Sequence, residues 1–365
     1  MKKIIVSTYD DIHNPFYGGG GAIAIHEIFK RLAASYFITV ITGKYPGCKD
    51  RETIDDINYI RVGSRVNLPR VSQIIYQLLL PIEALRLDYD LWIESFTPPF
   101  SVSLLPFIVK TKLIGLVHML GAADMKRKYH LPFDVVENFG LRFYKFIISP
   151  SELNSAKIRL LYPRADIVTI MNGIAPIAGI DPSAPKTHIT FLGRLEINQK
   201  GLDLLPHAYK KISRKIIYPL LIAGNGEQRE INRLRKLICQ LDLESQVRLV
   251  GRVTGTTEAK LLSQTLILVI PSRFETFSLV AIEAIVTHIP IITFDIEGMK
   301  WFPKSCGIKV APFNTTSFGG SMLKLSRDKS RLQQLIQNEN REAHNYSWDR
   351  TSQAYARYIS QVCAN

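Results

Sequence analysis

Residues 271–284 decide the fold, and they read PSRFETFSLVAIEA. They follow the apolar run Leu266 to Ile270, which we expect to form a buried strand, and a helix is expected to begin near Ser278. Glu275 then lies in a loop at the carboxyl end of a strand, the edge where open α/β sheets bind their ligands. The first N–H groups of the following helix form an anion site.

Glu283 is the only acidic residue from Phe277 to Phe294, and apolar residues surround it. Burial of an unpaired carboxylate is unfavourable, so we expect this side chain to have a partner. A pair of ribose hydroxyls would suit, because one carboxylate can accept both hydrogen bonds. An ordinary glutamate on a solvated stripe, or one paired with an arginine, is the alternative, and the spacing leaves both open.

Apolar strands alternate with helical segments along the chain in two series. The first series ends before Asn172, and the second begins near residue 187 and includes residues 271–284. This pattern is typical of parallel sheets covered on both faces, so we predict an α/β protein with two βαβ arrays. A stretch rich in proline and glycine, from Asn172 to Pro185, fits a linker between them. The predicted strands are Lys3–Ser7, Tyr36–Thr42, Leu91–Ile93, Leu113–Val117 and Phe146–Ile148, then Ile189–Leu192, Tyr218–Ala223, Val247–Val250, Leu266–Ile270 and Ile289–Phe294.

The tail is expected to be helical. Ser321 to Asn338 is predicted to be helical, and a last amphipathic helix is predicted to follow with Ser347 as its N-cap. Its buried side would carry Tyr355, Tyr358, Ile359 and Val362.

Composition narrows the function. The chain has 365 residues, more than one core usually spans, and its formal net charge of +14 favours anionic partners. The cations are spread over both halves without interleaved aromatics, which argues against nucleic-acid binding. Four cysteines without a C-x-x-C pair argue against a disulfide scaffold or a zinc ribbon. We expect no signal peptide, because only three apolar residues follow Lys3 before Ser7. We expect no membrane span, because Lys110 and Lys112 interrupt the apolar stretch around them.

A second motif, Gly193 to Gly201, carries two cations in what we expect to be a short loop before a helix. Arg194 offers a fork of donors and Lys200 a point charge, and together they can neutralise a diphosphate. A solvated surface loop is the alternative. The anion site near Ser278 favours the functional interpretation.

Two features of the first half are candidates as well. Gly18 to Gly21 would let the backbone approach a phosphate or leaving group closely, or would simply be a flexible turn. A dinucleotide fingerprint fits poorly, since position 24 is alanine. His118 follows a predicted strand and could bind a sugar hydroxyl or an acceptor, whereas a structural role is the alternative.

Other patterns are set aside or left open. Asp88-Tyr89-Asp90 resembles a metal-binding D-x-D but precedes its strand, at the opposite edge of the sheet. We interpret Gly224-Asn225-Gly226 as a simple strand-to-helix turn. The basic helix from Glu227 to Leu241 could lie on acidic lipid or be solvated. Val71 to Leu87 is an apolar helix that could pack in the core or contact a membrane.

In this order the motifs resemble the retaining glycosyltransferases of family 4. The resemblance rests on Glu275 and Glu283 with seven residues between them, supported by Arg194, Lys200, Gly224-Asn225-Gly226 and Gly251-Arg252-Val253. It implies the GT-B fold, in which two Rossmann-like βαβ domains face a central cleft. The implied domains are an acceptor-side domain (1–173), a nucleotide-sugar-binding domain (174–345) and a last helix (346–365) that crosses back to the first.

The resemblance also implies roles in the second domain. Arg194 and Lys200 would hold the diphosphate of the donor, with Gly193 beside them. Glu275 would contact the transferred sugar near its anomeric carbon, and Glu283 would bind the ribose. Backbone groups around Phe277, Ser278 and Leu279 would take phosphate oxygens.

In the first domain, Gly19 and Gly20 would approach the donor, and His118 would contact the sugar. This chain departs from the family pattern at Ser278, where glycine is common, and at Ile296 to Trp301, where a G-G-x-P-E loop is common. The second departure bears on the sugar contacts, and so on which donor is used.

The implied function is retaining transfer of a sugar from a nucleotide-sugar donor to a saccharide or lipid-linked acceptor. No metal or other cofactor is expected, because two fixed cations and a helix terminus can stabilise the departing diphosphate. The expected location is cytoplasmic, with a possible contact at the anionic inner face of the cell membrane. The alternatives are an epimerase or phosphorylase of the same architecture, and a catalytically silent membrane-bound assembly subunit.

Overall fold

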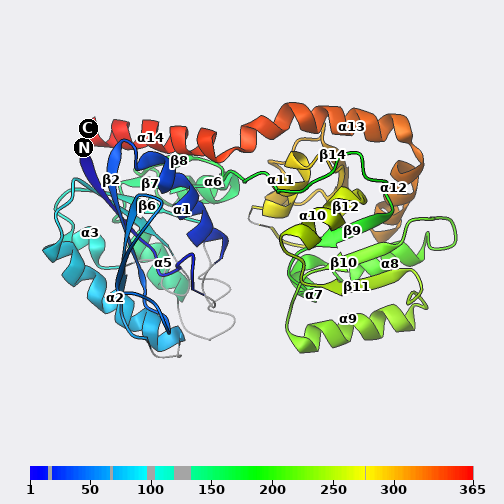
Figure 1. The fold of residues 1–365 in the computed structure, drawn as a ribbon, viewed down its shortest axis with the longest axis horizontal. Coiled ribbons are helices and arrows are strands. Elements are labelled where there is room, and N and C mark those ends of the chain that lie inside the picture. The colour runs from blue at the N-terminus through cyan, green and yellow to red at the C-terminus, as the bar shows by residue number, and fades with distance from the viewer. Residues whose placement is uncertain (15–18, 66–68, 97–102, 119–132, 276, 365) are drawn as a thin grey trace. The chain divides into compact units, whose positions relative to one another are not determined.

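The computed structural model describes the chain except residues 15–18, 66–68, 97–102, 119–132, 276 and 365. The chain forms two compact units (Figure 1). Unit 1 consists of residues 1–173 and 348–365, and unit 2 of residues 174–347.

Unit 1 is built on an eight-stranded sheet of the described residues, in the order β3-β4-β2-β1-β5-β6-β7-β8. Neighbouring strands run parallel except β3, which is antiparallel to β4. The strands are β1 (Lys2–Ser7), β2 (Tyr36–Gly43), β3 (Arg51–Ile54), β4 (Ile57–Val62), β5 (Leu91–Ser95), β6 (Lys112–Leu116), β7 (Phe146–Ser149) and β8 (Asp166–Thr169). The described helices are α1 (Gly20–Leu32), α2 (Pro69–Arg86), α3 (Leu105–Ile108), α5 (Phe133–Leu141), α6 (Glu152–Leu161) and α14 (Trp348–Ala364).

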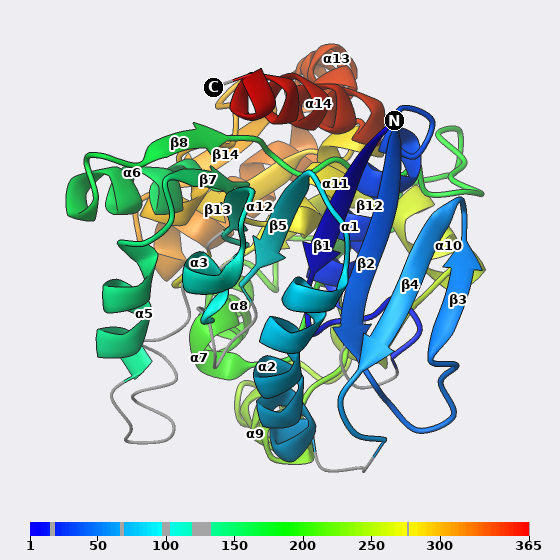
Figure 2. The same cartoon turned by 90° about the vertical axis from the view of Figure 1, so that its left-hand side faces the viewer.

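The alternation of side chains along β1 explains how helices cover both faces of this sheet. Ile4 and Val6 belong to the core formed with α1 and α14, whereas Ile5 belongs to the core formed with α2. Successive strand residues point to opposite faces, so a strand buried on both sides must be apolar throughout. Figure 2 views unit 1 from the side of α2, α3 and α5.

The predicted parallel sheet has an antiparallel exception at one edge, because β3 and β4 form a hairpin. Asp55 and Asp56 make its turn at positive φ, 48° and 61°, a conformation that aspartate tolerates better than most residues. The polar sequence of β3 and its exposed edge position hide it from a search for apolar runs.

The last helix has the buried face that its spacing predicts. Tyr355, Tyr358, Ile359 and Val362 are all buried, and Tyr355 packs edge-on against Phe29 of α1. The C-terminal segment is thus part of the core of unit 1.

Unit 2 has a six-stranded sheet among its described residues, in the order β11-β10-β9-β12-β13-β14, with all neighbours parallel. The strands are β9 (His188–Leu192), β10 (Leu220–Ala223), β11 (Val247–Gly251), β12 (Thr265–Ile270), β13 (Ile291–Phe294) and β14 (Gly307–Val310). The helices are α7 (Ile197–Lys200), α8 (Leu204–Lys210), α9 (Gln228–Gln240), α10 (Thr256–Ser263), α11 (Leu279–Val286), α12 (Thr315–Arg327) and α13 (Lys329–Glu342), with short 3-10 turns at Glu297–Met299 and Ala343–Tyr346.

The helical prediction for Ser321 to Asn338 is confirmed except at Asp328, where the helical region divides into α12 and α13. Asp328 separates them: its backbone is not helical (φ −98°, ψ 84°), and its side chain accepts a hydrogen bond from the N–H of Arg331. An aspartate at this position caps the second helix, which an apolar periodicity cannot reveal.

The two ends of unit 2 lie side by side. Ile174 forms a parallel bridge with Ser347, and its N–H donates to the carbonyl of Tyr346 at 2.8 Å. Unit 2 therefore begins and ends at one point.

Candidate functional site

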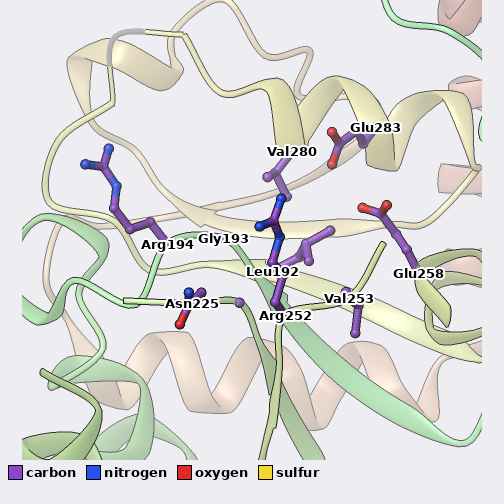
Figure 3. Close-up of a pocket in the computed structure, with 10 residues that line it drawn as sticks. Leu192, Gly193, Arg194, Asn225, Arg252, Val253, Glu258, Val280 and Glu283 are labelled. Atoms are coloured by element: carbon purple, nitrogen blue, oxygen red, sulfur yellow. The ribbon is translucent and has the colours of Figure 1, made fainter. Parts of the chain in front are cut away.

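A pocket of about 290 Å³ opens in unit 2 at the carboxyl ends of the strands. Arg194 comes from the loop after β9, Asn225 from the loop after β10 and Arg252 from the loop after β11 (Figure 3). The strand order reverses between β9 and β12, so the pocket lies at the topological switch point of the sheet, where doubly wound folds bind ligands. The lining residues are Leu192, Gly193, Arg194, Gly224, Asn225, Arg252, Val253, Glu258, Val280 and Glu283.

Glycines bring the loops of this pocket together. Gly224 has φ +146°, and a Cβ there would lie 1.7 Å from the carbonyl oxygen of Gly193. No other residue fits such a close approach of two backbones. Our interpretation of Gly224-Asn225-Gly226 as only a turn is therefore incomplete, because Gly224 and Asn225 line the pocket. Their place after a strand, like that of Arg194, was the signal available in the sequence.

Four charged side chains line the pocket without a protein partner. Arg194, Arg252, Glu258 and Glu283 make no side-chain hydrogen bond or ion pair with the described residues. Burial, and secondarily the charge of Glu258, raises the pKa of Glu283 to about 7. The sequence left open whether an arginine pairs with Glu283, and among the described residues none does.

Lys200 and Glu275 meet beside this pocket. Lys200 Nζ donates to Glu275 Oε1 at 2.8 Å, and Ser272 Oγ donates to the same oxygen at 2.6 Å. Glu275 is buried, with 5% of its surface exposed. The structure thus pairs a residue of each sequence motif, although neither of the two lines the pocket itself.

Lys200 does not lie in a loop, as we expected, but ends the single helical turn α7. Gly201 closes this turn in the left-handed region (φ 63°), where a Cβ would lie 1.9 Å from the carbonyl oxygen of Pro271. This close contact fixes Lys200 against residues 271–275.

The helix start predicted near Ser278 is confirmed, since Ser278 is the N-cap of α11. Its side chain makes no capping hydrogen bond, and the first turn contains no acidic residue. The N–H groups of this turn, including that of Leu279, therefore have no side-chain cap among the described residues, and they favour an anion.

The divergent loop packs onto the same segment. The ring of Trp301 lies 4.9 Å from that of Phe277, and a Cβ on Gly298 would lie 1.7 Å from the carbonyl oxygen of Glu275. The loop from Ile296 to Trp301 thus packs against Glu275 and Phe277, just before α11 begins. Thr276, between them, is outside the described residues.

The remaining candidates belong to unit 1. Gly19 is the N-cap of α1 and Gly20 its first residue, while Gly18 lies outside the described residues. His118 follows β6; burial lowers its pKa to about 4, and its buried Nε2 has no hydrogen-bond partner in the described chain. A Cβ on Gly21 would lie 3.7 Å from both His118 Cδ2 and Asp10 Oδ2.

Asp10 is a residue that our sequence reasoning missed. Its Oδ1 is buried without a partner among the described residues, and burial raises its pKa to about 6. It belongs to no sequence motif. It lies near Gly21 and His118 because it is in the segment between β1 and α1.

The structure accounts for the set-aside D-x-D. Asp90 accepts a hydrogen bond from the N–H of Lys3 at 2.7 Å, and Asp88 pairs with the Lys3 ammonium. Both lie where β5 begins, away from the carboxyl edge. The described residues contain no group of three or more His, Cys, Asp or Glu that could hold a metal ion.

Comparison with known proteins finds a family model that matches part of unit 2. Residues 186–328 match the family model described as glycosyl transferases group 1. Part of unit 2 therefore resembles the group 1 glycosyltransferases. An uncharacterized glycosyltransferase of Methanocaldococcus jannaschii is 33% identical over 164 residues, which is 44% of this chain and 41% of that protein.

A D-inositol 3-phosphate glycosyltransferase of Rhodococcus erythropolis is 27% identical over 220 residues, 57% of this chain and 49% of that enzyme. The aligned regions span about half the length of these curated relatives or less. Solved structures extend the likeness in fold to the whole chain. A sucrose-phosphate synthase from Thermosynechococcus elongatus matches with TM-score 0.80, 20% identity and complete coverage of both chains.

The Anabaena protein HepE, solved with UDP and glucose, matches with TM-score 0.76 and 17% identity over 99% of this chain and 100% of its own. At this level of identity the likeness concerns the fold alone. The two units therefore have the GT-B fold, with a Rossmann-like sheet of mostly parallel strands in each.

Proposed function

We propose that the protein is a retaining, metal-independent glycosyltransferase that moves a sugar from a nucleotide-sugar donor to a saccharide or lipid-linked acceptor. One observation carries the proposal: four unpaired charges line a switch-point pocket beside the Lys200–Glu275 pair and the start of α11. Unpaired charges in a pocket are costly for the free protein and are offset when a ligand of matching charge binds.

The donor diphosphate would bind between Arg194, Lys200 and the N–H groups of Phe277, Ser278 and Leu279, with Gly193 allowing close approach. As the bond to the sugar breaks, the leaving diphosphate gains negative charge. Cations and helix dipoles that are already fixed stabilise this charge without reorganisation. This electrostatic arrangement is the reason to propose metal independence.

The two glutamates would hold the donor at either side of the diphosphate. Glu283 accepts hydrogen bonds from the ribose, and Glu275 contacts the transferred sugar near its anomeric carbon. Retention requires the acceptor to attack the face that the diphosphate leaves. We assign no nucleophile.

In unit 1, Gly19 and Gly20 would approach the donor, and His118 would contact the sugar. With its pKa near 4, His118 is neutral at pH 7 and can both donate and accept hydrogen bonds, as hydroxyl groups require. Unit 1 is then the acceptor-side domain and unit 2 the donor domain.

Catalysis is tested by transfer from a panel of nucleotide sugars to saccharide and lipid-linked acceptors. Arg194→Ala, Lys200→Ala and Glu275→Gln should each lower the rate at least tenfold, whereas Arg229→Ala, at an exposed position on α9, should not. Wild-type rates in all three site variants would refute the site. A donor converted without any acceptor would indicate an epimerase, a requirement for inorganic phosphate a phosphorylase, and no turnover of any donor a silent subunit.

The protein also contacts an anionic membrane through unit 1, at the inner face of the cell membrane. The predicted helix 71–87 is α2 (Figure 2). It buries Tyr76, Leu80 and Ala84 in the core but leaves other apolar side chains exposed. With neighbouring residues of α3 and α5 it forms what we call the apolar face. Its members are Val71, Ile74, Leu78, Ile82, Leu85, Leu104, Phe107, Val135, Phe139 and Phe143.

The apolar face holds half of the exposed large apolar side chains among the described residues, and such patches mark interaction surfaces. Its aromatic part is continuous, since Phe143 lies 4.6 Å from Phe107 and 5.3 Å from Phe139, with Arg142 over the Phe139 ring. An arginine beside exposed phenylalanines suits an anionic lipid surface. Among the described residues no helix combines the length and apolar character needed to cross a bilayer.

Co-sedimentation with vesicles tests this contact. The protein should pellet with vesicles rich in anionic lipid, and Leu78→Glu with Leu85→Glu should release it. Ile217→Glu, at an even more exposed apolar position in unit 2, is the control and should still pellet. Recovery of wild type in the supernatant at low salt would refute membrane binding and leave the transfer assay unaffected.

A further inference from the structure

The charges in the pocket of unit 2 are ordered from end to end. Figure 3 shows Arg194 at one end and the carboxylates of Glu258 and Glu283 facing each other at the opposite end. Val280, Leu192 and Arg252 lie between these ends. A ligand in this pocket therefore meets a cation at one end and two acceptors at the other.

Glu258 is the member of this set that no motif assigned. It comes from α10, where its neighbours Thr257 and Lys260 are exposed, whereas Glu258 itself is half-buried. Burial raises the pKa of its carboxyl group. Its side chain has no hydrogen bond or ion pair with the described residues, so a second carboxylate faces Glu283 without an ion-pair partner among them.

A nucleotide fits this order of charges in one direction. With the phosphates at Arg194 and the ribose at Glu283, the base extends toward Glu258, and Arg252 lies beside the nucleotide. The planar guanidinium of Arg252 can stack on a base. Glu258 then needs donors on the edge of the base, because an ionised carboxylate only accepts hydrogen bonds.

The bases differ in what they offer such a carboxylate. Uracil and thymine have a single N–H, and the carbonyl oxygens on either side of it repel a carboxylate. Adenine has one amino group beside a ring nitrogen that accepts. Guanine alone has two adjacent donors, N1–H and the 2-amino group, which match the two oxygens of a carboxylate.

On the basis of the proposed function of this pocket, we infer that Glu258 reads the donor base and selects guanine, so that the donor is a GDP-sugar. The paired geometry predicts a preference for GDP over UDP of roughly tenfold or more, the range of a good bidentate contact. Inosine diphosphate lacks only the 2-amino group and isolates that hydrogen bond.

Binding of GDP, IDP and UDP to the full chain, measured by calorimetry, tests the inference. Wild type should bind GDP at least about tenfold more tightly than IDP. Glu258→Gln and Glu258→Leu should bring the ratio of the affinity for GDP to the affinity for IDP (the GDP/IDP ratio) close to one. Lys260→Ala, exposed on the same helix, should leave the ratio unchanged.

Glu283→Gln separates the inference from the proposed function. It should weaken all three nucleotides by a similar factor while the GDP/IDP ratio persists, because it removes only the ribose contact. Equal affinity of wild type for GDP and UDP, or an unchanged ratio in both Glu258 variants, would overturn the selection of guanine while the pocket stands. No binding of any nucleotide would overturn the proposed function and the inference together.

Discussion

Lys200 Nζ lies 2.8 Å from Glu275 Oε1, and the two residues are 75 positions apart in the chain. The pair joins the turn after β9 to the loop after β12, across the switch point of the sheet. With Ser272 also donating to Glu275, the carboxylate is fixed before any ligand binds. A preorganised charge pair of this kind affects both stability and catalysis.

Lys200→Ala should destabilise unit 2 as well as lower transfer. It leaves the buried Glu275 without its cation, and breaking a buried pair costs roughly 3 kcal/mol. Lys200→Met combined with Glu275→Gln should recover most of this loss in urea unfolding but none of the activity. Losses that simply add in the double variant would contradict coupling of the two side chains.

Nucleotide affinity should fall as the pH drops below about 7, the pKa of Glu283. Ribose hydroxyls donate to an ionised carboxylate, so a protonated Glu283 must release its proton on binding. The loss approaches tenfold per pH unit at most. Calorimetry in two buffers of different ionisation enthalpy measures the released proton, and Glu283→Gln should abolish this part of the pH dependence.

The same residue predicts a pH effect on stability. Its pKa is about 7 in the folded chain against 4.5 for an unperturbed carboxyl, so the folded state holds the extra proton between these values. The contribution of Glu283 to stability therefore falls as the pH rises through this window. Urea unfolding of wild type and Glu283→Gln at pH 5 and pH 8 would reveal it; parallel pH profiles would contradict it.

Two adjacent glycines of α12 should respond in opposite ways to alanine. A Cβ on Gly319 would lie 2.3 Å from the carbonyl oxygen of Ala208, whereas a Cβ on Gly320 meets nothing within 4 Å. Gly319→Ala should cost about 2 kcal/mol or more through overpacking. Gly320→Ala should add roughly 0.5–1 kcal/mol, because alanine is the better helix former. Shifts of the same sign in thermal melts would disprove the close packing of α12 on α8.

Arg61→Leu should strongly destabilise unit 1. Arg61 and Asp11 are fully buried and lie 2.8 Å apart, with Thr42 also donating to Asp11. Removing the arginine leaves a buried carboxylate, at a cost of roughly 3–5 kcal/mol. Arg61→Leu with Asp11→Asn should cost less than Arg61→Leu alone in chemical unfolding; an equal or larger cost would mean that the charge pair is not the cause.

The sequence predicted the two sheets because most of their strands are buried on both faces, which requires continuous apolar runs such as Leu91–Ser95 and Thr265–Ile270. Three of the four edge strands of the described sheets, β3, β8 and β14, escaped detection, and so did β4, which lies beside β3. Arg51–Ile54 and Asp166–Thr169 have no fully buried residue, so burial left no apolar signature in them.

The candidate site was predictable where strand ends fix the loops. Arg194, Lys200 and Glu275 lie within eight residues after a strand that the apolar pattern locates, and Glu283 lies on the helix that follows β12. Glu258 could not be found this way, because it lies in an ordinary polar helix. Glu258 becomes a candidate only because it faces Glu283 in the pocket, and a local sequence pattern cannot reveal this proximity.

The adjoining ends of unit 2 have a consequence for how such proteins diversify. Because Ile174 and Ser347 pair directly, residues 174–347 leave and rejoin the chain at one point. A segment with this property can be exchanged between homologous chains as a cassette, without stretching the host on either side. The matched family region, 186–328, lies wholly inside the cassette, while both chain termini belong to the host. Under the proposed division of labour, one recombination event would give unit 1 a new sugar donor and leave its acceptor unchanged.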